Sequence, residues 1–259
     1  MIRTGRVTLF TLFLIYLAVA LIFYWLGRRG KRFVLRRIPA LDAIEEGVGR
    51  AVEMQRPVHW TAGHPRASKL YDATGAYLAA GFTILIRVAQ VCMEKGARLL
   101  VSVGHPELYP IARDIVDTVY TLGGKPEEFR GENIVLVPEY SYLAAVIGRI
   151  IRERPATHIQ TGYFWYQDAL VLPEVARGEG CFNITGGQVT ALPFLIVQSD
   201  YTLIADELFA ASAQITGDPV LIGYIAGLDV IKGIMIALVV AGVTLASLGI
   251  QALSTLIKF

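Results

Sequence analysis

Several histidines, hydroxyl residues and glycines stand where predicted strands end, and together they could hold a small ligand. Three of the four histidines belong to this group. Backbone N–H groups at such turns and helix amino termini suit an anion such as a nucleotide phosphate. Turns also require glycine and polar residues in every α/β fold, so these residues have an equally simple structural explanation. The candidate ligand-binding residues are His59, Thr61, Gly63, His64, Gly104, His105, Glu139, Thr185, Gly186 and Gly187.

No established catalytic motif accompanies these residues. The chain lacks the glycine-rich GxGxxG turn, the phosphate-binding P-loop and the GxSxG nucleophile turn. His59 and His64 are five residues apart, which is not the i, i+4 spacing of a helical metal pair, and no acidic residue stands close to them in sequence. The sequence therefore predicts neither a catalytic residue nor a metal site, and it identifies no cofactor.

An acidic cluster, Asp200, Asp206 and Glu207, surrounds the start of a predicted helix. Asp200 suits the N-cap position, and carboxylates in a first turn interact favourably with the helix dipole. We interpret the cluster as capping, with a catalytic carboxylate pair as the alternative. Cys92 and Cys181 lie in apolar surroundings without CxxC spacing, which predicts two buried thiols rather than a disulfide framework.

Short apolar runs alternate with helical segments and predict the sheet that positions these residues. Strands are expected at 57–61, 97–103, 133–139, 156–162 and 181–185, with 191–197 as one more. Helices are expected at 43–55, 68–94, 106–122, 140–152, 167–177 and 201–214. Continuously apolar strands separated by helices are typical of parallel sheets covered on both faces. The pattern predicts an α/β domain with a Rossmann-like, mostly parallel doubly wound sheet of about five strands.

Two long uncharged segments predict membrane spans. Val7–Leu26 has twenty residues without a charge and Gly233–Ile257 has twenty-five, while roughly 20 helical residues cross a bilayer core of about 30 Å. The first segment could also be a signal peptide, but a basic stop-transfer cluster follows it and no small-x-small cleavage site is present. The predicted organisation is a transmembrane helix with a basic juxtamembrane segment (1–37), an α/β domain (38–219), and a connector followed by a transmembrane helix (220–259).

The charges are distributed asymmetrically, which predicts an orientation. The chain has a net charge of +2, but residues 1–37 hold eight basic residues and no acidic one, so the remainder carries −6. Six of the eight directly follow the first span, and basic residues beside a span prefer the cytoplasmic side. We expect a two-pass protein of the cell membrane with a cytoplasmic α/β domain and both termini outside. The acidic remainder has no basic patch for nucleic acid.

Small residues form a stripe along the second predicted span. Gly242, Ala246 and Gly249 recur at i, i+4 and i+7, a spacing that lets helix backbones approach closely. The partner is either the first span or another copy of the chain. Neither predicted span contains an ionisable residue, which argues against an ion pathway through them.

The segment PFLIVQSDYTLIADELFAASA at 193–213 resembles a signature of an uncharacterised prokaryotic membrane-protein family, a domain of unknown function. The matching parts are Pro193–Phe194, 200–204 with Asp200 and Tyr201, and 207–213 beginning at Glu207. RPVHWTAG (56–63), with the helix before it, and Arg154–Pro155 also resemble that family, so the resemblance covers roughly 40–230. Ala205–Asp206 differ from the Gly-Glu more usual there. The resemblance implies membrane association and a shared fold, and it implies no activity or catalytic residue.

Three functions remain open. The double anchor and the missing catalytic motif favour a non-enzymatic, membrane-anchored assembly protein, or scaffold, that forms a homo-oligomer on the lipid bilayer. The alternative is an enzyme or sensor that binds a nucleotide or another small anion at the glycine-rich strand ends. The third is an oligomeric channel or transporter component, because two spans per chain cannot enclose a pore alone.

Overall fold

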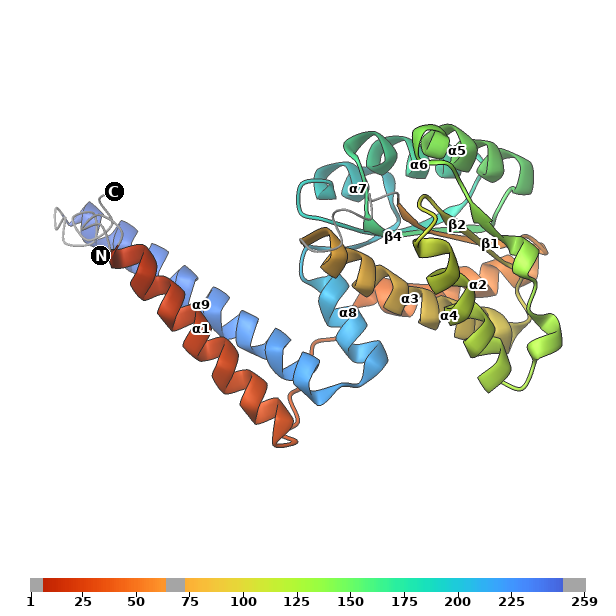
Figure 1. The fold of residues 1–259 in the computed structure, drawn as a ribbon. Helices are drawn as coiled ribbons and strands as arrows, with labels where there is room; N and C mark the ends of the chain where they lie inside the picture. Colours follow the sequence, from red (N-terminus) through yellow and green to blue (C-terminus); the bar gives the residue numbers. More distant parts are fainter. Residues whose placement is uncertain (1–6, 64–72, 249–259) are drawn as a thin grey trace. The chain divides into compact units, whose positions relative to one another are not determined.

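The computed structural model describes residues 7–63 and 73–248 and divides into two compact units (Figure 1). One unit combines both ends of the chain, Met1–Arg36 with Gly217–Phe259, and forms a helical hairpin. The other, Arg37–Thr216, is an α/β domain. The sequence between the two apolar segments therefore folds as a compact body of its own.

Within the described residues of the α/β domain, six parallel strands form one sheet in the order β3-β2-β1-β4-β5-β6. This confirms the predicted Rossmann-like sheet, with one strand more than the five expected. The order reverses between β1 and β4, which pair in register from Val58 opposite Thr157. The strands are β1 (Val58–Gly63), β2 (Leu99–Val103), β3 (Ile134–Leu136), β4 (Thr157–Tyr163), β5 (Phe182–Gly186) and β6 (Tyr201–Leu203).

Helices cover both faces of the sheet (Figure 1). On one face lie α2 (Pro39–Met54), α3 (Ala73–Lys95), α4 (Leu108–Leu122) and α8 (Glu207–Thr216). On the other lie α5 (Tyr142–Glu153), α6 (Tyr166–Gly178) and α7 (Leu192–Gln198). Short 3-10 turns at Pro126–Glu128, Gly131–Asn133 and Glu139–Ser141 flank β3. Crossover helices on both faces follow from parallel strands joined in this order.

Two predictions near the end of the domain are wrong. The apolar run 191–197 forms helix α7 instead of a strand, and Pro193 lies in its first turn, where the missing N–H costs no hydrogen bond. Tyr201 begins a strand instead of a helix, because β6 pairs with β5 from Tyr201 opposite Ile184. A short apolar run does not distinguish a buried strand from a buried helix, which explains the exchange.

The hairpin unit consists of α1 (Val7–Arg28) and α9 (Pro219–Ser247), which lie side by side. Gly223 and Gly227 of α9 face Phe23 of α1 so closely that an added Cβ would lie 2.9 Å from Phe23 O and 3.0 Å from Phe23 Cβ, respectively. At Gly27 an added Cβ would lie 2.6 Å from Pro219 O. The helices are therefore antiparallel and packed through glycines. The segment 221–230, expected as a connector, is the first part of α9.

Three of the described helices are long and apolar enough to cross a membrane, one more than expected: α1, α3 and α9. In α3 61% of the most apolar stretch is buried within the structure, against 6% in α1 and none in α9. Its buried residues belong to the core that α2, α4 and the sheet complete. Length and composition alone give core helices and spans the same signature, but α3 lies in the α/β domain, where a helix was expected at 68–94.

Candidate functional site

The strands of the α/β domain are apolar on one face and polar on the other. In β1, Val58, Trp60 and Ala62 belong to the apolar core, whereas His59 and Thr61 point to the opposite face. The same alternation runs through β4 and β5, and β2 contributes Ser102 to the second face. The buried polar side chains on this second face, here called the polar layer, are His59, Thr61, Ser102, His158, Gln160, Asn183 and Thr185.

A chain of hydrogen bonds crosses the polar layer from β2 to β4. Ser102 Oγ lies 2.8 Å from His59 Nε2, and His59 Nδ1 lies 2.9 Å from His158 Nδ1. The two imidazole rings stack with their centroids 5.0 Å apart. His158 Nε2 then lies 3.4 Å from Gln160 Oε1, and Gln160 Nε2 donates to the carbonyl of Asp168 in α6 (3.2 Å). The register of β1 between β2 and β4 brings these side chains together.

The acceptor group of Gln160 determines which atoms donate and which accept along this series of hydrogen bonds. Because Gln160 Oε1 can only accept, His158 Nε2 donates and the Nδ1 of neutral His158 accepts. His59 therefore donates from Nδ1 to His158 and accepts at Nε2 from the Ser102 hydroxyl. Both histidines are satisfied in their neutral forms. The arrangement needs no bound ligand to complete it.

Burial keeps both histidines uncharged. Desolvation lowers the pKa of His158 to about 4, despite the hydrogen bond with Gln160. Desolvation also lowers the pKa of His59 well below its ordinary value, and the neighbouring His158 and Arg149 act in the same direction. At neutral pH neither ring carries a positive charge.

Two residues of α5 fasten this helix to the polar layer. The guanidinium of Arg149 donates to Val101 O (2.6 Å), Ser102 Oγ (2.9 Å) and Asn133 O. Burial lowers the pKa of Arg149 to about 10, so the group stays charged at neutral pH. Tyr142 OH lies 2.5 Å from Thr61 Oγ1, whose own proton goes to Ser102 O (2.9 Å), and burial raises the pKa of Tyr142. The polar layer thus fixes α5 by directional bonds.

The sequence predictions missed most of these residues. Ser102, Tyr142, Arg149, His158 and Gln160 were outside the candidate set, because the strands were taken as continuously apolar. The signal was present as a polar residue at every second position, as in Val58-His59-Trp60-Thr61 and Thr157-His158-Ile159-Gln160. His59 and Thr61, predicted to line a cleft, lie at most 1% exposed inside this network.

The carboxyl ends of β1 and β4 come unusually close to one another. Gly63 has φ +87°, and a Cβ there would lie 1.9 Å from Tyr163 O. Gly162 has φ +147°, and a Cβ would lie 2.4 Å from Ala62 O. A Cβ at Gly81 of α3 would likewise lie 2.4 Å from Thr161 O. Gly63, expected to line a ligand site, thus acts with Gly162 and Gly81 to let two strands and a helix approach. His64 lies outside the described residues.

The other candidate positions lie at the same edge of the sheet and have structural partners. His105 is half-buried, and its Nδ1 accepts from the backbone N–H of Glu107 (3.4 Å) before α4. Glu139 is half-buried in the 3-10 turn after β3. Thr185 hydrogen bonds Ser199 (2.7 Å), and Cβ atoms at Gly186 and Gly187 would meet Leu203 and Leu195.

A side chain that the predictions overlooked joins two of these loops. Gln188, after β5, accepts from Phe164 N (3.1 Å) and donates to Phe164 O, so one amide holds the loop after β4. The same loops expose Trp165, Tyr166 and Val189 to solvent. This edge of the domain therefore combines a fixed backbone with exposed apolar side chains.

The residues of the family signature hold the end of the sheet together. Asp200 does not cap a helix as expected: its carboxylate accepts from Asn183 N (2.7 Å) and ties β6 to β5. Tyr201 packs edge-on against Phe182, with ring centroids 5.8 Å apart. Glu207 accepts from Ile204 N (2.9 Å) and caps the start of α8. These contacts give the signature a role in folding.

The predicted small-residue stripe lies near the carboxyl end of α9. Gly242 is half-buried and Ala246 is exposed, while Gly249 lies outside the described residues. The tight packing uses Gly223 and Gly227, which the predictions placed in a connector. Both cysteines are buried as predicted, and burial raises the pKa of Cys181 to about 12 and that of Cys92 further.

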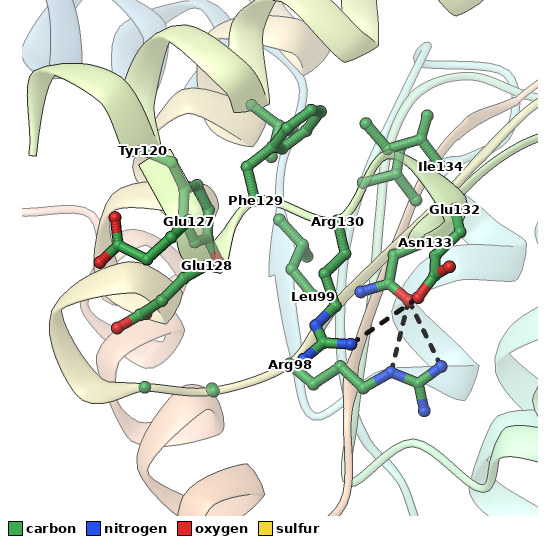
Figure 2. A pocket seen from close by; sticks show the side chains of 14 residues that line it. Arg98, Leu99, Tyr120, Glu127, Glu128, Phe129, Arg130, Glu132, Asn133 and Ile134 are labelled. Carbon is green, nitrogen blue, oxygen red and sulfur yellow. Dashed lines mark hydrogen bonds and ion pairs between the residues drawn. The ribbon is translucent and has the colours of Figure 1, made fainter. Parts of the chain in front are cut away.

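A pocket of about 470 Å³ lies at the opposite, amino-terminal edge of the sheet (Figure 2). The loop before β2, helix α4 and the segment leading into β3 enclose it. Arg98 hydrogen bonds Asn133 Oδ1 through Nε (3.4 Å) and Nη2 (3.3 Å), and Arg130 pairs with Glu132 (3.8 Å). Positive and negative groups alternate around the rim, so the pocket does not select one sign of charge.

No group of three or more histidine, cysteine or carboxylate side chains that could hold a metal occurs in residues 7–63 and 73–248. A family model described as a domain of unknown function (DUF6754) matches residues 1–257. No curated protein and no solved structure matches the chain.

Proposed function

The chain belongs to the DUF6754 family of unknown function, and we propose that it is a two-span membrane protein whose α/β domain acts as a homo-oligomeric scaffold. In this proposal α1 and α9 are the spans, and α3 stays in the domain core. The basic residues between Arg28 and Arg37 support an orientation with the domain in the cytoplasm and the far ends of both helices outside.

The observation that carries the proposal is the surface of the α1–α9 hairpin. The helices bury glycines against one another and expose large apolar side chains elsewhere, among them Phe13, Leu21, Ile22, Ile236 and Val239. Water disfavours such a continuous apolar surface, whereas lipid acyl chains accept it. Anchoring at both ends of the α/β domain would hold copies of the domain in one plane.

The polar layer supports a scaffold over an enzyme. Its histidines are buried, neutral and bonded to one another, so they offer neither access to a substrate nor a free base. Directional networks of this kind specify one packing of helix on sheet. A domain with a single rigid shape suits repeated contacts between identical copies.

Labelling in cells and light scattering test the proposal. Val34, 97% exposed beside the basic cluster, is replaced by cysteine, and a membrane-impermeant maleimide is applied to intact cells and to lysed cells. We expect labelling only after lysis. Wild type is the control, because Cys92 and Cys181 are buried. Labelling of intact cells would refute the orientation, extraction by alkaline carbonate would refute the anchoring, and a strictly monomeric detergent-solubilised protein would refute the scaffold.

The strand order favours a second candidate function, binding of a small anionic ligand. The order β3-β2-β1-β4-β5-β6 reverses between β1 and β4, and open α/β sheets bind ligands beyond the strand ends at such a point. A thermal-shift screen of nucleotides on the solubilised protein tests it, with His105→Ala as the site variant and the exposed Leu122→Ala as the control. Stabilisation of wild type that His105→Ala reduces would support the site. No stabilisation by any nucleotide would count against it.

A further inference from the structure

Helix α9 carries one ion pair within its apolar length, and the packing of the hairpin determines its depth. Asp229 Oδ1 and Lys232 Nζ lie 3.3 Å apart on successive turns. Gly27 of α1 lies against Pro219, and Phe23 lies against Gly223 and Gly227. Since the two helices run antiparallel, residues further along α9 from Pro219 lie level with residues that precede Gly27 in α1, one residue for one residue.

This register places the ion pair inside the bilayer if the hairpin spans it. The uncharged residues of α1 end at Leu26, level with the first turn of α9. At 1.5 Å per residue, Asp229 then lies about 14 Å and Lys232 about 18 Å inside the hydrocarbon, near the middle of a core of about 30 Å. The expectation that neither span contains an ionisable residue took the second span to begin at Gly233, whereas the candidate span of the structure begins at Pro219 and includes Asp229 and Lys232.

The ion pair lies on the face of α9 turned away from α1. At 100° per residue, Lys232 is about 140° round the helix from Gly227 and about 180° from Gly223. The side chains of Asp229 and Lys232 are 66% and 50% exposed. Further along the same face, Ile236, Val239 and Val243 are each more than 60% exposed. We call these five residues the outer stripe.

The outer stripe has the spacing of a helix–helix seam. Its members follow one another at intervals of three, four, three and four residues, which is the heptad pattern of left-handed helix pairs. Three of the five are β-branched, and these stiff side chains pack with little loss of rotamer freedom. A surface that only faced lipid would need no charges.

We propose that the outer stripe is the contact through which α9 of a second copy of this chain packs within the membrane. The inference rests on the proposed membrane insertion and names the surface that makes the scaffold oligomeric. Charges in the hydrocarbon are costly when they face lipid, and they are found facing other helices. A polar pair in an otherwise apolar seam also fixes register and partner.

The charges favour a second copy over another partner, because Asp229 and Lys232 of one copy complement Lys232 and Asp229 of the other. A two-fold axis along the membrane normal places α9 beside α9 at equal depth. Asp229 and Lys232 differ by about 4.5 Å along the helix, within the reach of a lysine side chain. Each carboxylate therefore meets the ammonium group of the other copy as well as its own. The dimer therefore adds two crossed ion pairs to the one within each copy, and the charges face another helix instead of lipid.

Disulfide cross-linking in native membranes tests the contact. Val239→Cys in the outer stripe is compared with Leu238→Cys, which has the same depth but points about 100° round the helix. We expect copper-phenanthroline to convert most Val239→Cys protein to a covalent dimer, and at least ten times less Leu238→Cys protein. Wild type supplies the background, because Cys92 and Cys181 are buried in the α/β domain.

Charge exchange in the Val239→Cys background tests the role of the ion pair. Asp229→Lys brings four ammonium groups together and is expected to lower the dimer yield at least tenfold. Asp229→Lys with Lys232→Asp restores the pairs and is expected to restore the yield. Resistance of each variant to alkaline carbonate confirms insertion.

The possible outcomes separate this inference from the scaffold proposal. Equal cross-linking at both cysteine positions, or no effect of Asp229→Lys, would overturn the outer stripe. An oligomer by light scattering without a Val239→Cys dimer would overturn it too, while leaving the scaffold intact. A monomer by light scattering without any dimer would overturn both.

Discussion

On one face of the sheet, Trp60 of β1 belongs to the apolar core that includes side chains of α2 and α3; on the other, His59 of the same strand lies among polar ones beneath α5. The apolar face is held by non-directional burial, which depends on volume and little on pH. The polar face is held by hydrogen bonds whose donors and acceptors must all match. One strand therefore uses two kinds of stabilisation, and different changes should break each.

The largest expected effect is on the apolar face. Trp60 is fully buried, packs against Phe82 and donates from Nε1 to Thr161 Oγ1 (2.9 Å). We expect Trp60→Ala to lower the free energy of unfolding of the α/β domain by about 3–5 kcal/mol, through the cavity and the lost hydrogen bond. Urea unfolding of the solubilised full chain, followed by circular dichroism, measures it. A loss below about 1 kcal/mol would contradict the packing described.

Arg149→Met should break the polar face at nearly the same cost. The substitution keeps the apolar stem but leaves Val101 O, Ser102 Oγ and Asn133 O without their shared donor. We expect a loss of about 3 kcal/mol in the same urea measurement, because unsatisfied buried acceptors are expensive. Arg152→Met, on the exposed side of α5, is the matched control and should change stability by less than about 0.5 kcal/mol. Similar losses for the two variants would mean that Arg149 contributes only packing.

The third expected effect is a dependence on pH that belongs to the polar face alone. The pKa of His158 is about 4 in the folded chain and about 6.5 when unfolded, so between these values the unfolded state binds more protons. Stability is therefore full above pH 7 and falls as the pH drops towards 4. His158 alone contributes a loss of about 2 kcal/mol at pH 5, and the lowered pKa of His59 adds to it.

A pair of variants isolates that effect. His158→Asn keeps an oxygen near the position of Nδ1 but does not titrate, so the unfolding free energy should vary less between pH 7 and 4.5. Trp60→Ala should keep the wild-type slope, because it alters only the apolar face. An unchanged slope in His158→Asn would show that other groups cause the acid loss.

This contrast also explains what the sequence could and could not reveal. The parallel sheet, its helices and the two long apolar helices outside the domain followed from periodicity and uncharged length. The polar layer did not, because His59 meets His158 and Ser102 only through the register of three strands distant in sequence. The position of Asp229 within the hairpin likewise required the pairing of α9 with α1, since a span was sought only where charges were absent.

The smallest expected effect concerns the link that brings α8 onto the apolar face. Ala205, between β6 and α8, has φ +51°, a left-handed conformation that costs alanine roughly 1 kcal/mol and glycine almost nothing. The family resemblance has Gly-Glu where this chain has Ala205–Asp206, so the backbone gives a reason for the more usual residue. We expect Ala205→Gly to raise the unfolding free energy by about 0.5 kcal/mol, part of the gain being offset by the freer unfolded chain. Urea unfolding at pH 7 and pH 5 measures it, and the gain should be equal at both because no polar-layer group is involved. Destabilisation by Ala205→Gly would contradict the left-handed turn, and a gain confined to one pH would tie the link to the polar face.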